Sequence, residues 1–166
     1  MDPEVIRELD LRRLRAVADY QFGPGAGEVL FPDGVEVIRS KTGRIRHAKL
    51  GNLLLATLRA SDGLLSLSIH GAERLSSFLG HRYKVIVAEE AAPFVAEGKS
   101  VFAKHVLEAD PEIRPGDEVL VVGPDGRLLA VGKAVLSGRE MLFFKRGVAV
   151  KVRSGVARKG PSLTES

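Results

Sequence analysis

Glycine and proline residues divide much of this chain into short β-branched runs, and this spacing constrains the fold more than any other feature. The sequence holds 18 glycines and 8 prolines among its 166 residues. Most of them fall between the apolar runs, which is typical of turns that join strands rather than of a low-complexity tract. With 45% hydrophobic and 28% charged residues, the chain can also bury a core. The sequence therefore predicts a globular protein rich in β-structure.

Composition excludes several kinds of site. The chain has no cysteine, which excludes disulfides, thiolate zinc sites and cysteine nucleophiles. Its histidines lack the spacing of metal ligands; they are His47, His70, His81 and His105. No apolar run approaches the roughly 20 residues that span a bilayer, and the segment Met1–Glu4 does not resemble a signal peptide. We therefore expect a soluble, cytoplasmic protein without a metal, a cofactor or membrane contact.

Cations gather in two stretches of a chain whose net charge is +4. No acid lies between Glu36 and Asp62, and none lies between Glu140 and Glu165. The cations in these stretches are Arg39, Lys41, Arg44, Arg46, Lys49 and Arg59, and then Lys145, Arg146, Lys151, Arg153, Arg158 and Lys159. Clustered cations on a β framework favour a polyanion partner, because each neutralised phosphate releases counterions. Solvated basic faces without a partner are the alternative.

The first half of the chain predicts a helix, four strands and a second helix. Asp2 and Pro3 can begin a helix that reaches Tyr20. Its apolar residues recur near helical spacing and predict one buried stripe, made of Val5, Ile6, Leu9, Leu14, Val17 and Ala18. The glycine-rich segment 22–28 predicts a loop, the alternative being a backbone that another surface approaches closely. Alternating runs around 41–43 and 60–63 predict two hairpins, and a short helix follows near Gly71.

The second half predicts a small barrel after a seam at residues 81–83. Lys84–Ala88 predicts a strand, and Ala91–Glu97 predicts a short helix that Gly98 ends. Further strands are expected at 101–106, 118–122, 128–136, 141–144 and 148–152. We therefore predict an α+β fold with an N-terminal helix-plus-sheet domain at 1–80, a β-barrel at 83–156 and a flexible tail at 157–166.

Two parts of the chain resemble known families. The segments that resemble a PUA domain, a small β-barrel that binds structured RNA, are Gly98–Lys104, Asp110–Val119 and Lys145–Arg153. The segments that resemble the domain before PUA in archaeal archaeosine tRNA-guanine transglycosylase are Ala18–Gly27, Arg39–Arg46, Ala60–Gly63 and Gly71–Ala72. Together the two similarities span roughly residues 9 to 155, and they imply an archaeal origin.

The resemblance implies a non-catalytic RNA-binding protein. In that family the catalytic barrel, with its aspartate nucleophile and zinc site, precedes these domains, and nothing in this sequence corresponds to it. The implied partner is RNA, most simply the acceptor arm and CCA end of a tRNA in tRNA modification. The alternative is an adaptor, or a separate RNA-binding subunit, that docks a catalytic tRNA-modifying or ribosome-assembly partner.

The resemblance also implies an RNA-binding surface on the barrel. The positions that match the family's glycine loop and last strand are Gly98–Phe102 and Gly147–Arg153. The candidate residues there are Gly98, Lys99, Ser100, Val101, Gly147, Lys151 and Arg153, and Lys145 and Arg146 lie in the turn just before the strand. Alternation along the last strand places its valines inside and Lys151 and Arg153 outside. Lys145 and Arg146 fit phosphate contacts and a solubilising charge pair equally well. We interpret Phe102 as a core residue, the alternative being a base-stacking residue.

The first hairpin offers a second candidate surface. Arg44 and Arg46 share one face of a strand by the period of two. They can contact phosphate there together with Lys49, and Gly43 fits a turn position that requires positive φ. The alternative is that the two arginines pair with Glu36 or Asp33 across the sheet.

Overall fold

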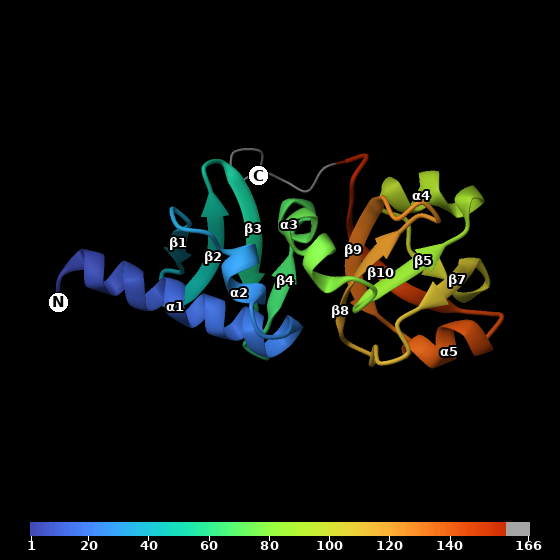
Figure 1. The fold of residues 1–166 in the computed structure, drawn as a ribbon, viewed down its shortest axis with the longest axis horizontal. Helices are drawn as coiled ribbons and strands as arrows, with labels where there is room; N and C mark the ends of the chain where they lie inside the picture. The colour runs from blue at the N-terminus through green and yellow to red at the C-terminus, as the bar shows by residue number, and fades with distance from the viewer. Residues whose placement is uncertain (159–166) are drawn as a thin grey trace. The chain divides into compact units, whose positions relative to one another are not determined.

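A computed structural model describes residues 1–158 of the chain. Apart from its first two residues, the predicted tail at 157–166 lies outside the described residues. The chain divides into two compact units, of which the first contains Met1–Phe78 and the second begins at Leu79. Figure 1 shows the elements of each unit in chain order.

The first unit is a four-stranded antiparallel sheet with three helices. The sheet has the order β1-β2-β3-β4, so consecutive strands are neighbours. Its elements are α1 (Pro3–Phe22), α2 (Ala26–Leu30), β1 (Glu36–Arg39), β2 (Ile45–Leu50), β3 (Leu53–Leu58), β4 (Leu65–Leu67) and α3 (Ile69–Leu79). Both predicted hairpins are confirmed. The start of α1 is also as predicted, because the Asp2 carboxylate accepts a hydrogen bond of 3.0 Å from the Glu4 amide.

Two expectations for the first unit are wrong in part. The glycine-rich segment is not only a loop, because α2 begins inside it and packs on α1. A Cβ at Gly27 would lie 2.3 Å from the Arg15 carbonyl oxygen, so the alternative of a closely approached backbone is the correct one. The buried stripe of α1 includes Leu14 and Ala18 but excludes its first two turns, where Leu9 is 46% exposed. These turns project beyond the sheet (Figure 1).

The second unit is a nearly closed, six-stranded barrel with the strand order β6-β10-β9-β8-β5-β7. Its elements are β5 (Lys84–Val87), η1 (Glu89–Ala91), α4 (Ala92–Ala96), β6 (Val101–Phe102), η2 (Ala103–His105), β7 (Val106–Ala109), β8 (Glu118–Val122), β9 (Leu128–Ala134), α5 (Gly138–Phe143) and β10 (Val148–Gly155). The strands at the two ends of the order, β6 and β7, are joined by the single turn η2. The chain therefore passes directly from one edge of the sheet to the other.

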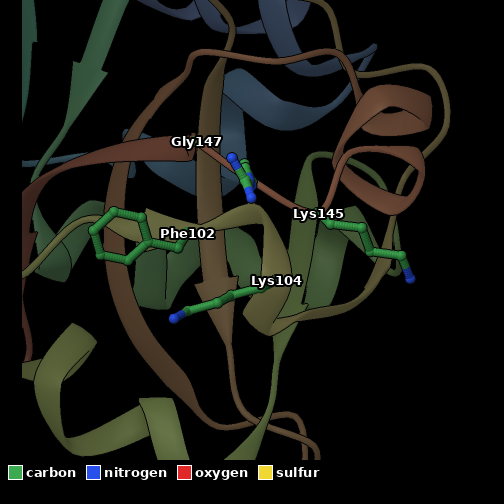
Figure 2. A pocket seen from close by; sticks show the side chains of 5 residues that line it. Phe102, Lys104, Lys145 and Gly147 are labelled. Atoms are coloured by element: carbon green, nitrogen blue, oxygen red, sulfur yellow. The ribbon is translucent and has the colours of Figure 1, made fainter.

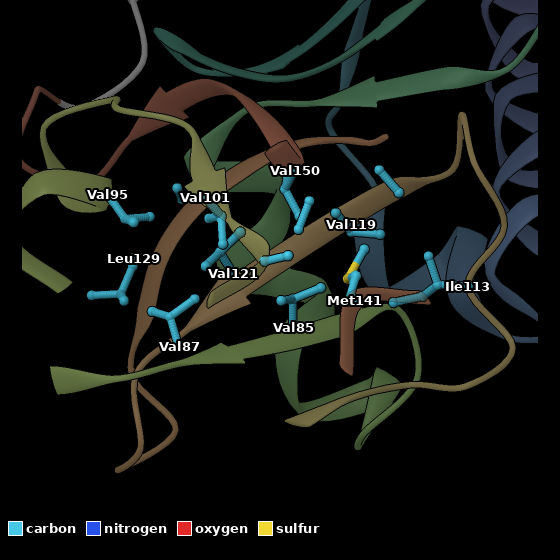
Figure 3. Packing of buried hydrophobic residues seen from close by; sticks show 14 of the residues in the cluster. Val85, Val87, Val95, Val101, Ile113, Val119, Val121, Leu129, Met141 and Val150 are labelled. Atoms are coloured by element: carbon cyan, nitrogen blue, oxygen red, sulfur yellow. The ribbon is translucent and has the colours of Figure 1, made fainter. Parts of the chain in front are cut away.

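The core of the barrel is apolar and built mainly from β-branched residues. Figure 3 shows Val85, Val119, Val121, Leu129 and Val150 together in the interior, and each is at most 2% exposed. Burial of one such side chain stabilises the fold by about 1.5–3 kcal/mol. This core holds the backbone of β10, and with it the candidate RNA-binding strand, in a fixed place.

Two of the predicted strands are corrected by the structure. Residues 141–144 are not a strand, because α5 covers all but the last of them. A capping box starts this helix: the Ser137 hydroxyl accepts from the Glu140 amide at 3.2 Å, and the Glu140 carboxylate accepts from the Ser137 amide at 2.9 Å. The strand expected at 101–106 is broken by η2, which turns the chain from β6 into β7.

Candidate nucleic-acid interface

The glycine loop and the last strand of the barrel lie side by side. β6 pairs with β10 in antiparallel fashion, with Val101 opposite Val150 and Phe102 opposite Val148. The Ser100 hydroxyl, just before β6, accepts a hydrogen bond of 3.4 Å from the Val152 amide. Two segments that are distant in sequence therefore form one surface. The predicted positions Gly98, Lys99 and Ser100 lie on that surface next to those of β10, whereas the side chain of Val101 is 1% exposed and lies in the core.

Gly155 permits this close approach. A Cβ at Gly155 would lie 2.1 Å from the Ala96 carbonyl oxygen and 2.8 Å from the Gly98 amide nitrogen. Only a glycine allows the backbone after α4 to rest on β10 in this way. Gly98 itself turns the chain with a φ of +104° and has open space around it. Gly155 was not among the residues predicted from the sequence, although a glycine at the end of a strand rich in β-branched residues could have indicated it.

Lys151 forms a pair of exposed cations with Lys133. Both are exposed, and they are directly opposite each other on β10 and β9. No ion pair among residues 1–158 includes either lysine. Lys133 was missed, since strand register is not readable from one sequence. The alternation on β10 also departs from expectation at Ala149, which is buried with Val150 because the register shifts between Val148 and Val150.

Arg153 is exposed on the same strand, but its charge is largely balanced. Its guanidinium binds both carboxylate oxygens of Glu118, and the bond from Nη1 to Oε1 is 3.0 Å long. The Glu118 side chain is 0% exposed, whereas that of Arg153 is 37% exposed. A bidentate pair of this kind is strong and fixes the orientation of the arginine. Arg153 therefore supports a buried carboxylate, and only its outer edge faces solvent.

A pocket of about 200 Å³ opens beside the start of β10, and its lining residues are Phe102, Lys104, Lys145, Arg146 and Gly147. The interpretation of Phe102 as a core residue is wrong, since its side chain is 47% exposed. Side chains alternate along β6, so Val101, which is 1% exposed, points into the barrel and Phe102 points away. Figure 2 shows the side chains of Phe102, Lys104 and Lys145 at this pocket.

The positive charge of the pocket cations is not neutralised by neighbouring acids, because no ion pair within the described chain involves Lys104, Lys145 or Arg146. A phosphate contact and a solubilising charge pair both require Lys145 and Arg146 to be exposed. The structure places these two residues at a pocket together with an aromatic ring. Lys104 was not identified from the sequence, because η2 brings it to this pocket only when the expected strand is broken.

Arg44 and Arg46 are exposed on the first hairpin. Gly43 turns the chain there with a φ of +85°. The acids weighed as their partners bind other cations: Asp33 lies 3.1 Å from Arg15 Nη2, and Glu36 lies 3.0 Å from Lys49 Nζ. In the described part of the chain neither arginine forms an ion pair. The hairpin therefore presents two available cations, whereas Lys49 is held by Glu36.

The positive charge of the hairpin also acts on a neighbouring histidine. Burial lowers the pKa of His47 from its ordinary value, and the adjacent Arg46 charge lowers this pKa further. The Nδ1 atom of His47 lies 3.0 Å from the Thr57 hydroxyl. The pKa of His47 therefore reports the electrostatic potential at the hairpin.

No group of three metal-ligating side chains gathers among the described residues. None of their helices has both the length and the apolar character of a membrane-spanning segment.

Comparison with known proteins assigns a domain family to each half of the chain. Residues 12–82 match the patch-forming domain C2 of tRNA-guanine transglycosylase. Residues 83–156 match the PUA domain.

Curated relatives share the same two domains within longer chains. A tRNA-guanine(15) transglycosylase of Methanothermobacter thermautotrophicus is 53% identical over 88% of this chain, which covers 23% of that protein. The Pyrococcus abyssi protein of the same name is 52% identical over 91% of this chain, which covers 26% of it. The chain thus spans about a quarter of the length of these relatives.

Solved structures support the fold. A hypothetical protein from Pyrococcus horikoshii OT3 superposes with a TM-score of 0.73 at 27% identity, over 96% of both chains. A conserved PUA domain protein from Thermoplasma acidophilum superposes with a TM-score of 0.65 at 21% identity, over 96% of this chain and 93% of that one.

Proposed function

This chain belongs to the proteins that join a patch-forming C2 domain of the tRNA-guanine transglycosylase type to a PUA domain, and we propose that it binds RNA in tRNA modification. The observation that carries this proposal is the continuous surface formed by the glycine loop 98–101 and β10. Lys99 and Lys151 are exposed there, with Lys133 opposite Lys151, and none of the three takes part in an ion pair among residues 1–158. Cations of this kind contact phosphate oxygens of RNA. The names of the curated relatives support tRNA as the RNA class.

The chemistry of the surface favours positioning of RNA rather than catalysis. Lys99, Lys133 and Lys151 can contact phosphate oxygens, and the glycine loop lets RNA backbone approach without a Cβ in the way. A single-stranded end can then place base edges against exposed backbone groups. We therefore propose a non-catalytic role in the cytoplasm, with the acceptor arm and the CCA end of tRNA as the bound element.

The direct test compares intact tRNA with tRNA that lacks its 3′ CCA, across a range of salt concentrations. We expect tight binding that weakens on CCA removal and a steep decrease in affinity with salt, because each phosphate contact releases counterions. The variant Lys133→Ala/Lys151→Ala should lower the salt slope by about two. The matched control is Arg114→Ala/Arg139→Ala, which removes two exposed cations elsewhere on the same unit.

The results would separate the levels of the proposal. Indifference to CCA removal, with affinity retained, would overturn the acceptor-end assignment but not RNA binding. Equal effects of the two double variants would overturn the assignment of the surface. Absence of binding to any tRNA at low salt would overturn the RNA-binding function.

A second candidate function is that of a separate RNA-binding subunit that docks a catalytic partner. The first two turns of α1 favour it, because Val5, Ile6 and Leu9 are 41%, 37% and 46% exposed there. Size-exclusion chromatography with a transglycosylase fragment that lacks these two domains would test it. Co-elution that Val5→Ser/Leu9→Ser abolishes is the expected result, and separate elution of the wild-type proteins would contradict it.

A further inference from the structure

We propose that the pocket beside β10 binds one unpaired nucleotide, whose base stacks on Phe102 and whose neighbouring phosphates contact Lys104, Lys145 and Arg146. This inference rests on the proposed RNA-binding function and deepens it. It assigns the stacking residue, and it predicts that the pocket does not distinguish adenine from cytosine.

The position of Phe102 makes its ring available to a ligand. Its backbone is held by the pairing of β6 with β10, where it is opposite Val148. Its side chain is nevertheless 47% exposed, while the neighbouring Val101 is 1% exposed in the core. The ring therefore sits on a rigid strand and faces the pocket rather than the barrel interior. Every nucleobase has a π-face that can stack on such a ring.

The cations are spread across the pocket. In Figure 2 the Lys104 side chain extends alongside Phe102, and the Lys145 side chain extends away from it. Neither they nor Arg146 take part in an ion pair within residues 1–158. Dispersed cations suit the successive phosphates of an extended strand, which follow one another on either side of a stacked base. A single compact anion would instead favour cations that converge on one point.

The lining side chains provide donors but no acceptors for the edge of a base. They are one ring, two ammonium groups, one guanidinium and a glycine, so none of them can accept a hydrogen bond. Selection of adenine or cytosine by a side chain requires an acceptor, such as an amide or a carboxylate, whereas lysine and arginine can donate to guanine. We therefore infer that stacking in this pocket does not distinguish adenine from cytosine.

The size of the pocket fits one base that remains partly open to solvent. Its volume is about 200 Å³, which is below the roughly 300–1,000 Å³ of sites that enclose a drug-sized ligand. A strand that passes over the surface and inserts one base fits these dimensions.

A fluorescence titration of the full chain tests the proposal. The probe is an RNA hairpin with a short 3′ overhang that contains 2-aminopurine, whose emission falls when it stacks. The protein contains no tryptophan, so its own emission does not obscure the signal. We expect quenching on binding to the wild-type protein. Phe102→Leu should abolish the quenching and weaken binding at least about fivefold.

Two further variants isolate the ring. Phe102→Tyr keeps an aromatic face and should retain both the quenching and the affinity. Phe143→Leu removes an aromatic side chain that is 79% exposed and lies outside the pocket, and it should change neither. Unlabelled overhangs that carry adenine or cytosine in place of the probe should compete for the protein within about threefold of each other.

The outcomes distinguish this proposal from the function on which it rests. If wild-type protein binds the RNA and Phe102→Leu binds it equally well with the same quenching, the pocket assignment is overturned and RNA binding stands. A blunt hairpin that binds as tightly as the overhang would overturn the assignment in the same way. If the wild-type protein binds no RNA, both proposals are overturned.

Discussion

Two basic stretches of this chain look alike in sequence and differ in what their charges do. In the stretch from Arg39 to Arg59, three cations are ion-paired, with Arg39 on Asp10, Lys49 on Glu36 and Arg59 on Asp62. In the stretch from Lys145 onward, Arg153 alone is ion-paired among the described residues. Charge density along a sequence therefore does not reveal how much charge a surface offers to a ligand.

The paired cations of the first unit hold its elements together. Arg39 donates to both carboxylate oxygens of Asp10 on α1, and it also donates to the Gly43 carbonyl at the hairpin turn. This arginine thus ties the turn to the helix. The second unit has ion pairs of its own, which hold Arg127 to Glu89 and Asp125 and Arg139 to Glu112. Lys133, Lys145, Arg146 and Lys151 take part in no ion pair among residues 1–158 and remain available to a polyanion.

The largest expected effect concerns the one paired cation of the second stretch. Arg153→Met leaves the buried Glu118 carboxylate without its bidentate partner, and we expect the free energy of unfolding of the second unit to fall by about 3 kcal/mol. Urea denaturation followed by NMR signals of that unit measures it. Glu118→Met/Arg153→Met removes both charges and should recover most of the loss. A loss below about 0.5 kcal/mol would mean that Glu118 does not hold Arg153. The charge of Arg153 would then be as available to RNA as that of Lys151.

The next effect concerns the unpaired lysines. Lys133→Ala/Lys151→Ala should weaken tRNA binding by about 2 kcal/mol, or roughly 30-fold, because two phosphate contacts are lost. Thermal stability should not fall, since neither side chain takes part in an ion pair among residues 1–158 and their like charges lie directly opposite each other. Fluorescence anisotropy at fixed salt concentration gives the affinity. An unchanged affinity would mean that Lys133 and Lys151 do not contribute to RNA binding.

A smaller effect is expected from the hairpin of the first unit. Arg44→Ala/Arg46→Ala should weaken tRNA binding by about 1 kcal/mol, or roughly fivefold, because these two cations lie on a separate exposed turn. The same anisotropy assay measures it, with Lys133→Ala/Lys151→Ala in parallel. A loss larger than that of the lysine pair would reverse the contrast and make the hairpin the main RNA contact.

The smallest expected effect is a change in the pKa of His47. The folded-state pKa of His47 lies below its ordinary value of 6.5, so its neutral form contributes stability that is present above pH 6.5 and declines as the pH falls below it. Arg46→Ala removes one cause of the lowered pKa and should raise it. Phosphate bound at the hairpin should act in the same direction. NMR titration of the His47 ring, with and without RNA, measures both shifts, and an unchanged pKa in Arg46→Ala would exclude Arg46 as a cause.

Local patterns predicted much of the fold. The turn at Gly43 and the alternation of the flanking runs were sufficient for the first hairpin, and Asp2 with Pro3 was sufficient for the start of α1. The error at residues 141–144 arose because Phe143 and Phe144 favour strands, whereas the capping box of Ser137 and Glu140 determined the outcome.

The candidate site was only partly predictable, because it depends on strand register. The sequence indicated the glycine loop and the last strand as separate segments. Lys133 joins the surface through its place opposite Lys151. Phe102 faces outward because it follows Val101, whose side chain lies in the core. The local sequence around these residues gives neither the register of Lys133 nor the face of β6 that the core covers. Gly155 had a local signal, but its meaning became clear only from the carbonyl of Ala96 that approaches it.

The most direct measurement is a map of backbone amide shifts in the isotope-labelled full chain during titration with a tRNA acceptor minihelix that ends in CCA. We expect the largest amide shifts at residues 98–104 and 145–153, with smaller shifts around Arg44 and Arg46. Shifts concentrated on the hairpin of the first unit or along α1, with the glycine loop and β10 unaffected, would contradict this expectation.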